Sequence, residues 1–144
     1  MAMLFANVNF WPIFAAAIAS WLFGAVYYTA LSTPWLKAQG LDPEQCKAEM
    51  AGKSKLVMIG PFILAFVGAF IMAWVFYGVL THLKTFSIRA GLISAAVLWV
   101  GFVLTTMTIN NAFTQRKPML TVIDSLHWLG GMLIMVAIIG AWGG

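Results

Sequence analysis

The segment IDSLHW carries two side chains suited to acid–base chemistry, Asp124 and His127, three residues apart. Residues at this spacing share one face of a helix. A carboxylate beside an imidazole stabilises the protonated ring near physiological pH, so the pair predicts handling of a proton or an ion. Two alternatives stay open. The pair can satisfy a helix end at a membrane interface, where the helix dipole favours Asp124, or it can recognise a polar ligand headgroup.

Further polar candidates precede this pair. Asn110 and Asn111 lie at the end of an apolar run, and Tyr28 lies at the interfacial end of an earlier one. An interhelical hydrogen bond inside a membrane contributes only about 0.6 to 2 kcal/mol, yet it orients helices. We therefore expect both asparagines to join helices. With Tyr28 they complete the candidate set for a polar ligand or proton site.

Metal or haem ligation has little support in the sequence. Cys46 is the single cysteine, and the two histidines, His82 and His127, are expected near opposite membrane faces, roughly 20 to 30 Å apart. One chain cannot clamp a haem between them, although ligands from different subunits stay an alternative. The sequence has no phosphate-binding glycine loop, zinc spacing or nucleophile elbow. We expect no cofactor, metal or catalytic residue, and lean against an enzyme.

The composition of the chain indicates that these residues belong to a membrane protein. Hydrophobic residues make up 62% of the 144 residues and charged residues 8%, against roughly 25% charged residues in a soluble domain. Four apolar runs, at about residues 10–31, 56–80, 88–112 and 122–142, approach or exceed the ~20 residues that cross a bilayer. Because the runs lack two-residue alternation, they predict helices and not a barrel. We expect one all-α domain over residues 1–144, an integral membrane bundle of four transmembrane helices in contact with the lipid bilayer.

Basic residues indicate the orientation of the bundle. The side shared by both termini has only Lys84 and Arg89, whereas the first and third connections carry Lys37, Lys47, Lys53, Lys55, Arg116 and Lys117. Positive residues favour the cytoplasmic side, so both termini are predicted outside the cytoplasm. The net charge of +4 does not indicate nucleic acid, because the basic residues are scattered over short loops.

The first connection and the second span each contain a proline that affects the predicted helices. Asp42 before Pro43 predicts a short surface helix at about residues 43–50, with a partner docking surface as the alternative role. Pro61 lies near the start of the second span, where a proline is either tolerated in the first turn or kinks the helix.

Small residues at helical spacing predict close helix packing. In the first span they are Ala16, Ser20 and Gly24, four residues apart, followed three residues later by Tyr27. The second span has a similar face made of Ala65, Gly68, Ala69 and Ala73. The short turn after the second span predicts that spans two and three are antiparallel neighbours. Most tryptophans and tyrosines lie near predicted interfaces and are interpreted as anchors.

Several motifs resemble a bacterial membrane protein family known as domain of unknown function seventeen sixty-one. They are Asn9 and Trp11, the end GAVYY of the first span, Trp35, the run GFVLTTMTINNAF, and the later RKP and IDSLHWL. The resemblance implies a four-span protein of bacterial origin, hence of the inner membrane. It marks Asn110, Asn111, Asp124 and the Trp128 region as motif positions, and it implies no activity.

The leading functional hypothesis is a non-enzymatic membrane protein that acts through helix packing, as a homo-oligomer or as an accessory subunit of a larger membrane complex. Small-residue faces on several helices motivate it. The alternative is a transporter or channel for a small solute, ion or proton that uses a polar edge at Asn110, Asp124 and His127.

The predicted orientation can be tested with a reporter that is active only in the cytoplasm. Fused after Gly144, it is expected to be inactive, because the C-terminus is predicted outside the cytoplasm. The same reporter placed in the connection between spans one and two should be active. An active fusion after Gly144 would reverse the orientation.

Overall fold

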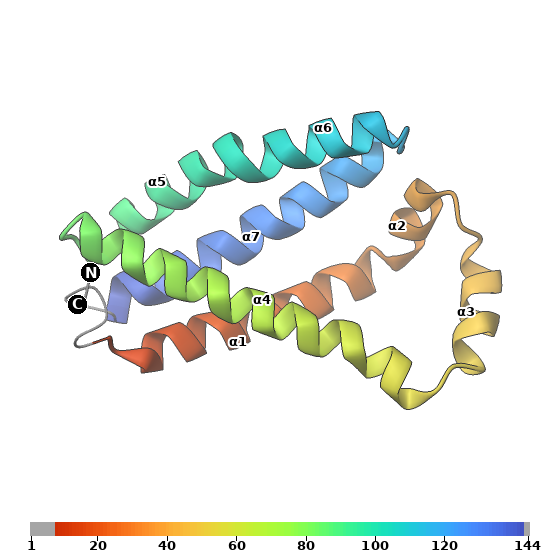
Figure 1. Cartoon of the computed structure of the whole chain (residues 1–144), viewed down its shortest axis with the longest axis horizontal. Coiled ribbons are helices and arrows are strands. Elements are labelled where there is room, and N and C mark those ends of the chain that lie inside the picture. The colour runs from red at the N-terminus through yellow and green to blue at the C-terminus, as the bar shows by residue number, and fades with distance from the viewer. Residues whose placement is uncertain (1–7, 143–144) are drawn as a thin grey trace.

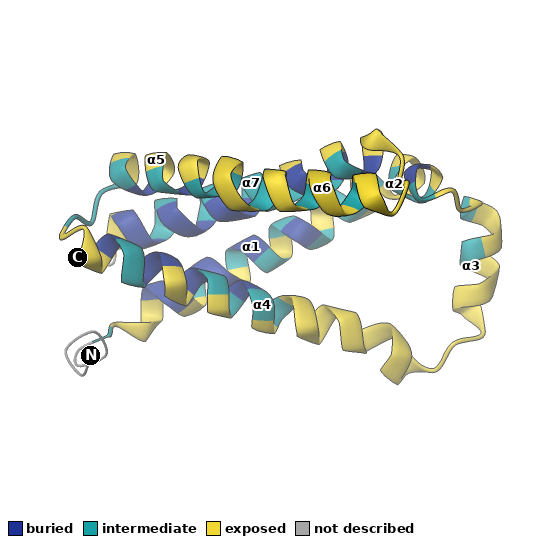
Figure 2. Ribbon diagram, turned by 45° about the horizontal axis from the view of Figure 1, so that its top comes forward, coloured by how far each residue is buried: buried dark blue, intermediate teal, exposed yellow. Residues whose placement is uncertain are grey.

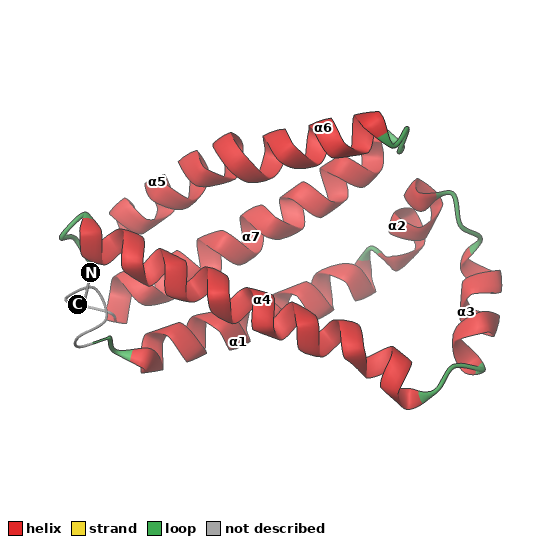
Figure 3. Ribbon diagram, viewed as in Figure 1, coloured by secondary structure: helices red, strands yellow, loops and turns green. Residues whose placement is uncertain are grey.

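The computed structural model describes residues 8–142, in which all regular secondary structure is helical (Figure 1, Figure 3). Four helices are long and apolar enough to cross a membrane, and the expected all-α membrane bundle is confirmed. In chain order the elements are α1 (Phe10–Ala30), α2 (Ser32–Gln39), α3 (Pro43–Ala51), α4 (Lys55–His82), α5 (Ile88–Leu98), the π-helical η2 (Trp99–Leu104), α6 (Thr105–Phe113) and α7 (Pro118–Trp142).

The spanning helices lie within a few residues of the predicted apolar runs, and the largest difference is at the start of the fourth. The helix begins at Pro118, whereas the apolar run begins at Val122. Proline suits the first helical position, because its fixed φ matches a helix and its missing N–H would have no partner there. Hydropathy alone does not detect this extra turn, which makes Asp124 the seventh residue of the helix and not the third.

Two short helices occupy the first connection. The predicted surface helix is α3, and the side chain of Asp42 caps it by accepting a 2.9 Å hydrogen bond from the Glu44 N–H. The other helix, α2, is not among the elements predicted from the sequence; Pro34 lies in its first turn, where a proline is tolerated. Gly40 ends α2 with φ +81°, a conformation that glycine adopts without steric cost.

The last helix, α7, is the centre of the bundle. It packs against α1, α4 and α5, and α2 lies beside its first turns (Figure 1). Spans two and three are antiparallel, as predicted, but they approach each other near their connecting turn and then diverge on either side of α7 (Figure 1). Their predicted neighbourhood is therefore correct only at that end. Buried residues concentrate on α1, α7 and the second half of α4 (Figure 2).

The small residues of α1 pack as predicted, whereas those of α4 do so only in part. Ala16, Ser20 and Gly24 are all buried, facing α7 or α4. On α4, Ala69 and Ala73 are buried, but Ala65 is exposed and a Cβ at Gly68 would meet nothing within 4 Å. The close-packing face of α4 is thus confined to its second half.

The first half of α4 leaves the bundle, and one hydrogen bond ties it to α1. Residues 55–65 are exposed (Figure 2), and the helix is continuous through Pro61. The indole N–H of Trp21 donates a 3.0 Å bond to the carbonyl of Phe62. This bond lies one residue after Pro61 and joins this exposed part of α4 to α1.

The packing of α7 against the start of α5 predicts the effect of a single methyl group. A Cβ at Gly140 would lie 2.7 Å from the carbonyl carbon and oxygen of Ser87. Gly140→Ala is therefore expected to lower the free energy of unfolding in detergent by about 1 to 3 kcal/mol, because backbone must move. Gly68→Ala, where the new methyl group has open space, is the control and should not destabilise. Equal stability of both variants would contradict this packing.

Candidate functional site

The sequence candidates lie at the end of the bundle where α2, α6 and the start of α7 meet (Figure 1). Asp124 is the seventh residue of α7 and His127 follows on the same face. Both side chains are partly buried. The helix start at Pro118 places Asp124 almost two turns inside the helix, whereas a start at Val122 would leave it in the first turn.

Asp124 is held by two neutral donors from other elements. The Tyr28 hydroxyl at the end of α1 donates to Asp124 Oδ1 at 2.8 Å, and the Trp35 indole N–H of α2 donates to the same oxygen at 2.9 Å. Within residues 8–142, the second oxygen, Oδ2, accepts no hydrogen bond, and no basic side chain lies within 4.0 Å. Tyr28 and Asp124, both candidates from the sequence, are therefore hydrogen-bonded to each other, while Trp35 was named in the sequence only as a family motif residue.

Two further aromatic side chains bind backbone carbonyls on either side of Asp124. The Tyr27 hydroxyl donates to the carbonyl of Ile123 at 2.9 Å, and the Trp99 indole N–H donates to the carbonyl of Ser125 at 2.7 Å. A carbonyl has two lone pairs, so each can accept this bond in addition to a helical one. Three consecutive residues of α7 therefore receive side-chain donors from α1, α2 and η2. We call these four donors the aromatic clamp: Tyr27, Tyr28, Trp35 and Trp99.

The π-helical segment η2 begins at Trp99, a member of the clamp. A π-helical turn closes its hydrogen bonds one residue later than an α-helical turn, and such turns are often found at functional sites. The wider turns change the rotational phase of every residue that follows. The faces of the third span inferred from α-helical spacing therefore do not continue across η2.

His127 packs among aromatic rings and forms no ion pair with Asp124. Its ring is parallel to Phe23 within 5°, with centroids 6.1 Å apart, and its centroid lies 4.7 Å from that of Tyr28. Within the described part of the chain, the only ion pair joins Lys47 and Glu44. The expected Asp124–His127 pair thus shares a face without direct contact, and each side chain has its own set of neighbours.

A glycine on α1 makes room for the imidazole. A Cβ at Gly24 would lie 2.7 Å from Nε2 of His127. The other ring nitrogen, Nδ1, is buried and has no hydrogen-bond partner among the described residues. Gly24 therefore permits the close approach of α1 and α7 at this level, and the sequence indicated this role only as general small-residue packing.

The two asparagines take different positions. Asn111 donates from Nδ2 to the hydroxyl of Thr121 at 2.9 Å and so joins α6 to α7, the role expected from the sequence. Asn110 is exposed, and its carboxamide makes no side-chain hydrogen bond within residues 8–142. The structure therefore brings Asn111, Tyr28, Asp124 and His127 to one end of the bundle and leaves Asn110 on the outer face of α6.

A lysine links the first and third connections beside this site. Lys117 donates from Nζ to the carbonyl of Lys37 at 2.9 Å, which holds the end of α2 to the start of α7. A cation near the last carbonyls of a helix also suits the helix dipole. Sequence spacing contains no signal for this bond, because 80 residues separate the two lysines.

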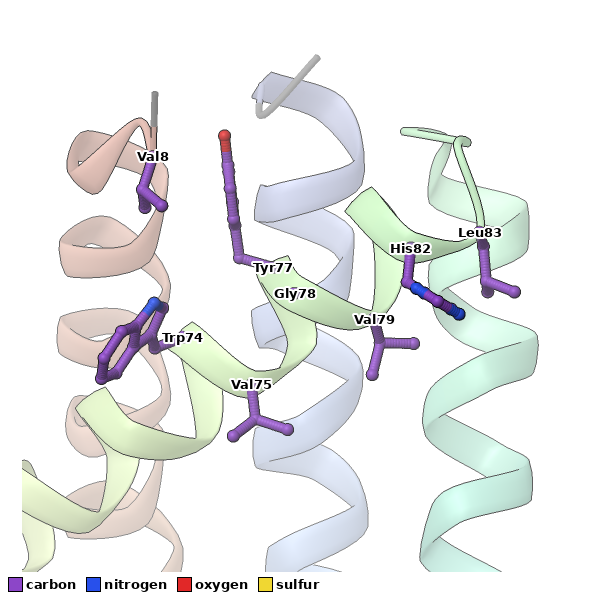
Figure 4. Close-up of a pocket in the computed structure, with 8 residues that line it drawn as sticks. All are labelled: Val8, Trp74, Val75, Tyr77, Gly78, Val79, His82 and Leu83. Atoms are coloured by element: carbon purple, nitrogen blue, oxygen red, sulfur yellow. The ribbon is translucent and has the colours of Figure 1, made fainter. Parts of the chain in front are cut away.

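A shallow hollow of about 570 Å³ lies on α4, well away from Asp124 (Figure 4). Most of its lining comes from the second half of α4, including Trp74 and His82, and Val8 closes one side. In Figure 4, Trp74 and His82 point to different sides of the helix and do not converge on a common point. Within the described residues, no group of three or more His, Cys, Asp or Glu side chains is arranged to hold a metal ion.

Comparison with known proteins identifies the family. A family model described as "Protein of unknown function (DUF1761)" matches residues 11–140, and the chain therefore belongs to this family. The match confirms the resemblance seen in the sequence motifs and covers most of the chain, including Tyr28, Trp35, Trp99 and Asp124. No curated protein and no solved structure matches the chain.

The Tyr28–Asp124 hydrogen bond can be measured with a double-mutant cycle. Tyr28→Phe should lower the free energy of unfolding by about 1 to 3 kcal/mol, because a bond to a carboxylate is lost. In an Asp124→Asn background the same substitution should cost less, since the charge is gone. Unfolding in detergent would be followed for all four proteins. Equal losses in both backgrounds would show that the hydroxyl and carboxylate are not coupled.

Proposed function

We propose that this member of the DUF1761 family is a non-enzymatic membrane protein that assembles with further copies of itself through the outer face of its third span. The observation that carries the proposal is the lack of internal cover on that span. Only 6% of its most apolar stretch is buried within the chain, against 39% for the fourth span. Some of the exposed side chains, the small ones of α6, are also of the kind that membrane helix interfaces favour.

The exposed surface of α6 and η2 includes several small residues beside the large exposed side chains of Phe102, Ile109 and Phe113. Thr105, Thr108 and Ala112 are spaced three and four residues apart and are exposed, and Gly101 before them is exposed as well. A Cβ at Gly101 would meet nothing within 4 Å. Small side chains let two helix backbones approach closely, which is how membrane helices associate without a hydrophobic driving force.

The threonines on this face are already satisfied by their own helix. Thr105 donates to the carbonyl of Gly101 at 2.7 Å, and Thr108 donates to the carbonyl of Leu104 at 2.6 Å. They therefore enter an apolar contact without leaving an unpaired hydroxyl. Asn110 differs, because its exposed carboxamide has no partner in the described chain.

The chemistry of Asn110 favours a second copy as the partner. A carboxamide offers both donors and an acceptor, so the same residue on a two-fold related copy is complementary to it. The stretch 100–112 carries no charge, and an identical stretch meets it without electrostatic repulsion. The alternative is that a different subunit of a larger membrane complex covers this face.

The proposal places the protein in the bacterial inner membrane with both termini outside the cytoplasm. The basic residues of the first and third connections support this orientation, because α2, α3 and the turn before α7 lie at one end of the bundle (Figure 1). The Lys117–Lys37 bond connects these two segments directly. A cluster of basic groups at one end is the pattern of a cytoplasmic face.

The transport alternative retains Asp124 and His127 but loses Asn110, which faces outward on α6. Proton or cation flux through vesicles containing the purified protein, abolished by Asp124→Asn, would favour that alternative over the proposal.

Disulfide trapping tests the interface. With Cys46, the single cysteine, replaced by serine, cysteine at Thr105, Thr108 or Ala112 is introduced in turn. Oxidation in native membranes is expected to produce a covalent dimer from at least one position, because a two-fold interface brings equivalent residues close together. Adding Gly101→Leu to the reactive variant should reduce the dimer by blocking close approach.

The matched control is cysteine at Ile63, which is 59% exposed on α4. It should remain monomeric under the same oxidation. Dimer formation from Ile63→Cys but from none of the three α6 positions would contradict the proposed face and move the contact to α4.

A further inference from the structure

Asp124 is the only acidic residue outside the first connection. The other three acids are in or beside α3: Asp42, Glu44 and Glu49. A carboxylate within a membrane-spanning helix is costly unless it has a partner. The partners that the chain supplies, Tyr28 and Trp35, are both neutral, so they satisfy hydrogen bonding without balancing the charge.

The two oxygens of Asp124 are unequal. Oδ1 accepts the bonds from Tyr28 and Trp35, whereas Oδ2 accepts none within residues 8–142. An ionised carboxylate would leave Oδ2 without a donor. A protonated carboxyl would leave its O–H without an acceptor. In either state this oxygen is completed only by a group from outside the described chain, and Asp124 is exposed enough to be reached.

Three aromatic rings lie close together beside Asp124, and two of them donate to its Oδ1. The Tyr28 and Trp35 rings meet edge to face with centroids 5.2 Å apart, and Tyr27 lies 5.5 Å from Tyr28. All three side chains are partly exposed. Tryptophan and tyrosine rings attract organic cations through their electron-rich faces, and quaternary ammonium sites use this combination of rings and negative charge.

We propose that Asp124 Oδ2, together with the rings of Tyr28 and Trp35, binds an alkylammonium group. The cation balances the charge of Asp124, and the rings contact its carbon atoms. A divalent metal ion fits less well, because no group of three His, Cys, Asp or Glu ligands exists in the described chain and one carboxylate is a poor metal site.

The depth of Asp124 allows two sources of the ammonium group. The residue lies roughly 9 Å along the helix axis from Pro118. This level is close to the boundary between hydrocarbon and headgroups in a bilayer with a core of about 30 Å. The same chemistry therefore belongs either to the headgroup of an ethanolamine or choline lipid or to a free alkylamine in solution.

Calorimetric titration of the purified full chain in an uncharged detergent tests the site. Tetramethylammonium and ethanolammonium chloride are added separately, with sodium chloride at the same ionic strength as reference. The wild-type protein should bind the ammonium ions saturably. Asp124→Asn keeps the shape and the Oδ1 acceptor but removes the charge, and is expected to weaken binding by about tenfold or more.

Two variants separate this site from general effects. Trp35→Phe retains a ring with a weaker cation attraction, so it should weaken binding by less than Asp124→Asn does. Glu44→Gln removes an equal charge from the exposed surface of α3 and should leave the affinity unchanged. Binding of sodium as tight as that of the ammonium ions, or equal ammonium binding by wild type and Asp124→Asn, would overturn the proposal.

Native mass spectrometry identifies the source of the ammonium group. Protein is extracted from vesicles with equal amounts of phosphatidylethanolamine and phosphatidylglycerol. Retention of phosphatidylethanolamine by wild type but not by Asp124→Asn would assign the site to a lipid headgroup. Saturable binding of ammonium salts without such retention would assign it to a free amine, which supports the same chemistry.

Discussion

The aromatic clamp on residues 123–125 is the interaction on which the rest of this end of the molecule depends. Four donors from three elements converge on one turn of α7. Together they fix the height and the rotation of α7 against α1, α2 and the third span. A hydrogen bond in a membrane contributes modestly by itself. Its directionality, repeated four times, selects one arrangement among many that apolar packing would tolerate.

Several other features follow from this fixed arrangement. The short helix α2 is held against α7 through Trp35 and the Lys117–Lys37 bond, although it has only one buried residue of its own. The ring of His127 is set one turn after Asp124, where Gly24 leaves space for it. The site thus joins the end of α1, the short helix α2 and η2 to one turn of α7.

The helices pack closely around α7, whereas other surfaces of the bundle have little cover from the chain itself. Glycine and alanine allow α1 and α5 to approach α7 closely, while the first half of α4 and the outer face of the third span have little internal cover. Lipid covers aliphatic surface as well as protein does. A surface with threonines and an unpaired Asn110 is better covered by another helix, and it lies on a different face from Asp124. The proposed assembly and the proposed ammonium site are therefore independent of each other.

Local signals in the sequence determined the membrane bundle, the approximate spans, the helix α3 and the identity of Asp124 and His127 as the notable ionisable residues. The length of an apolar run, the capping residues and the residue spacing are local properties that extend over a few helical turns. They can therefore be recognised in a single sequence. The partners of Asp124 depended on tertiary structure, since Tyr28 is 96 residues away and Trp35 is 89 residues away. The separation of Asn110 from Asn111 likewise followed from how α6 sits against α7 after the π-helical turns. These outcomes depend on the relative rotation and height of packed helices. Short-range sequence patterns contain no information about either.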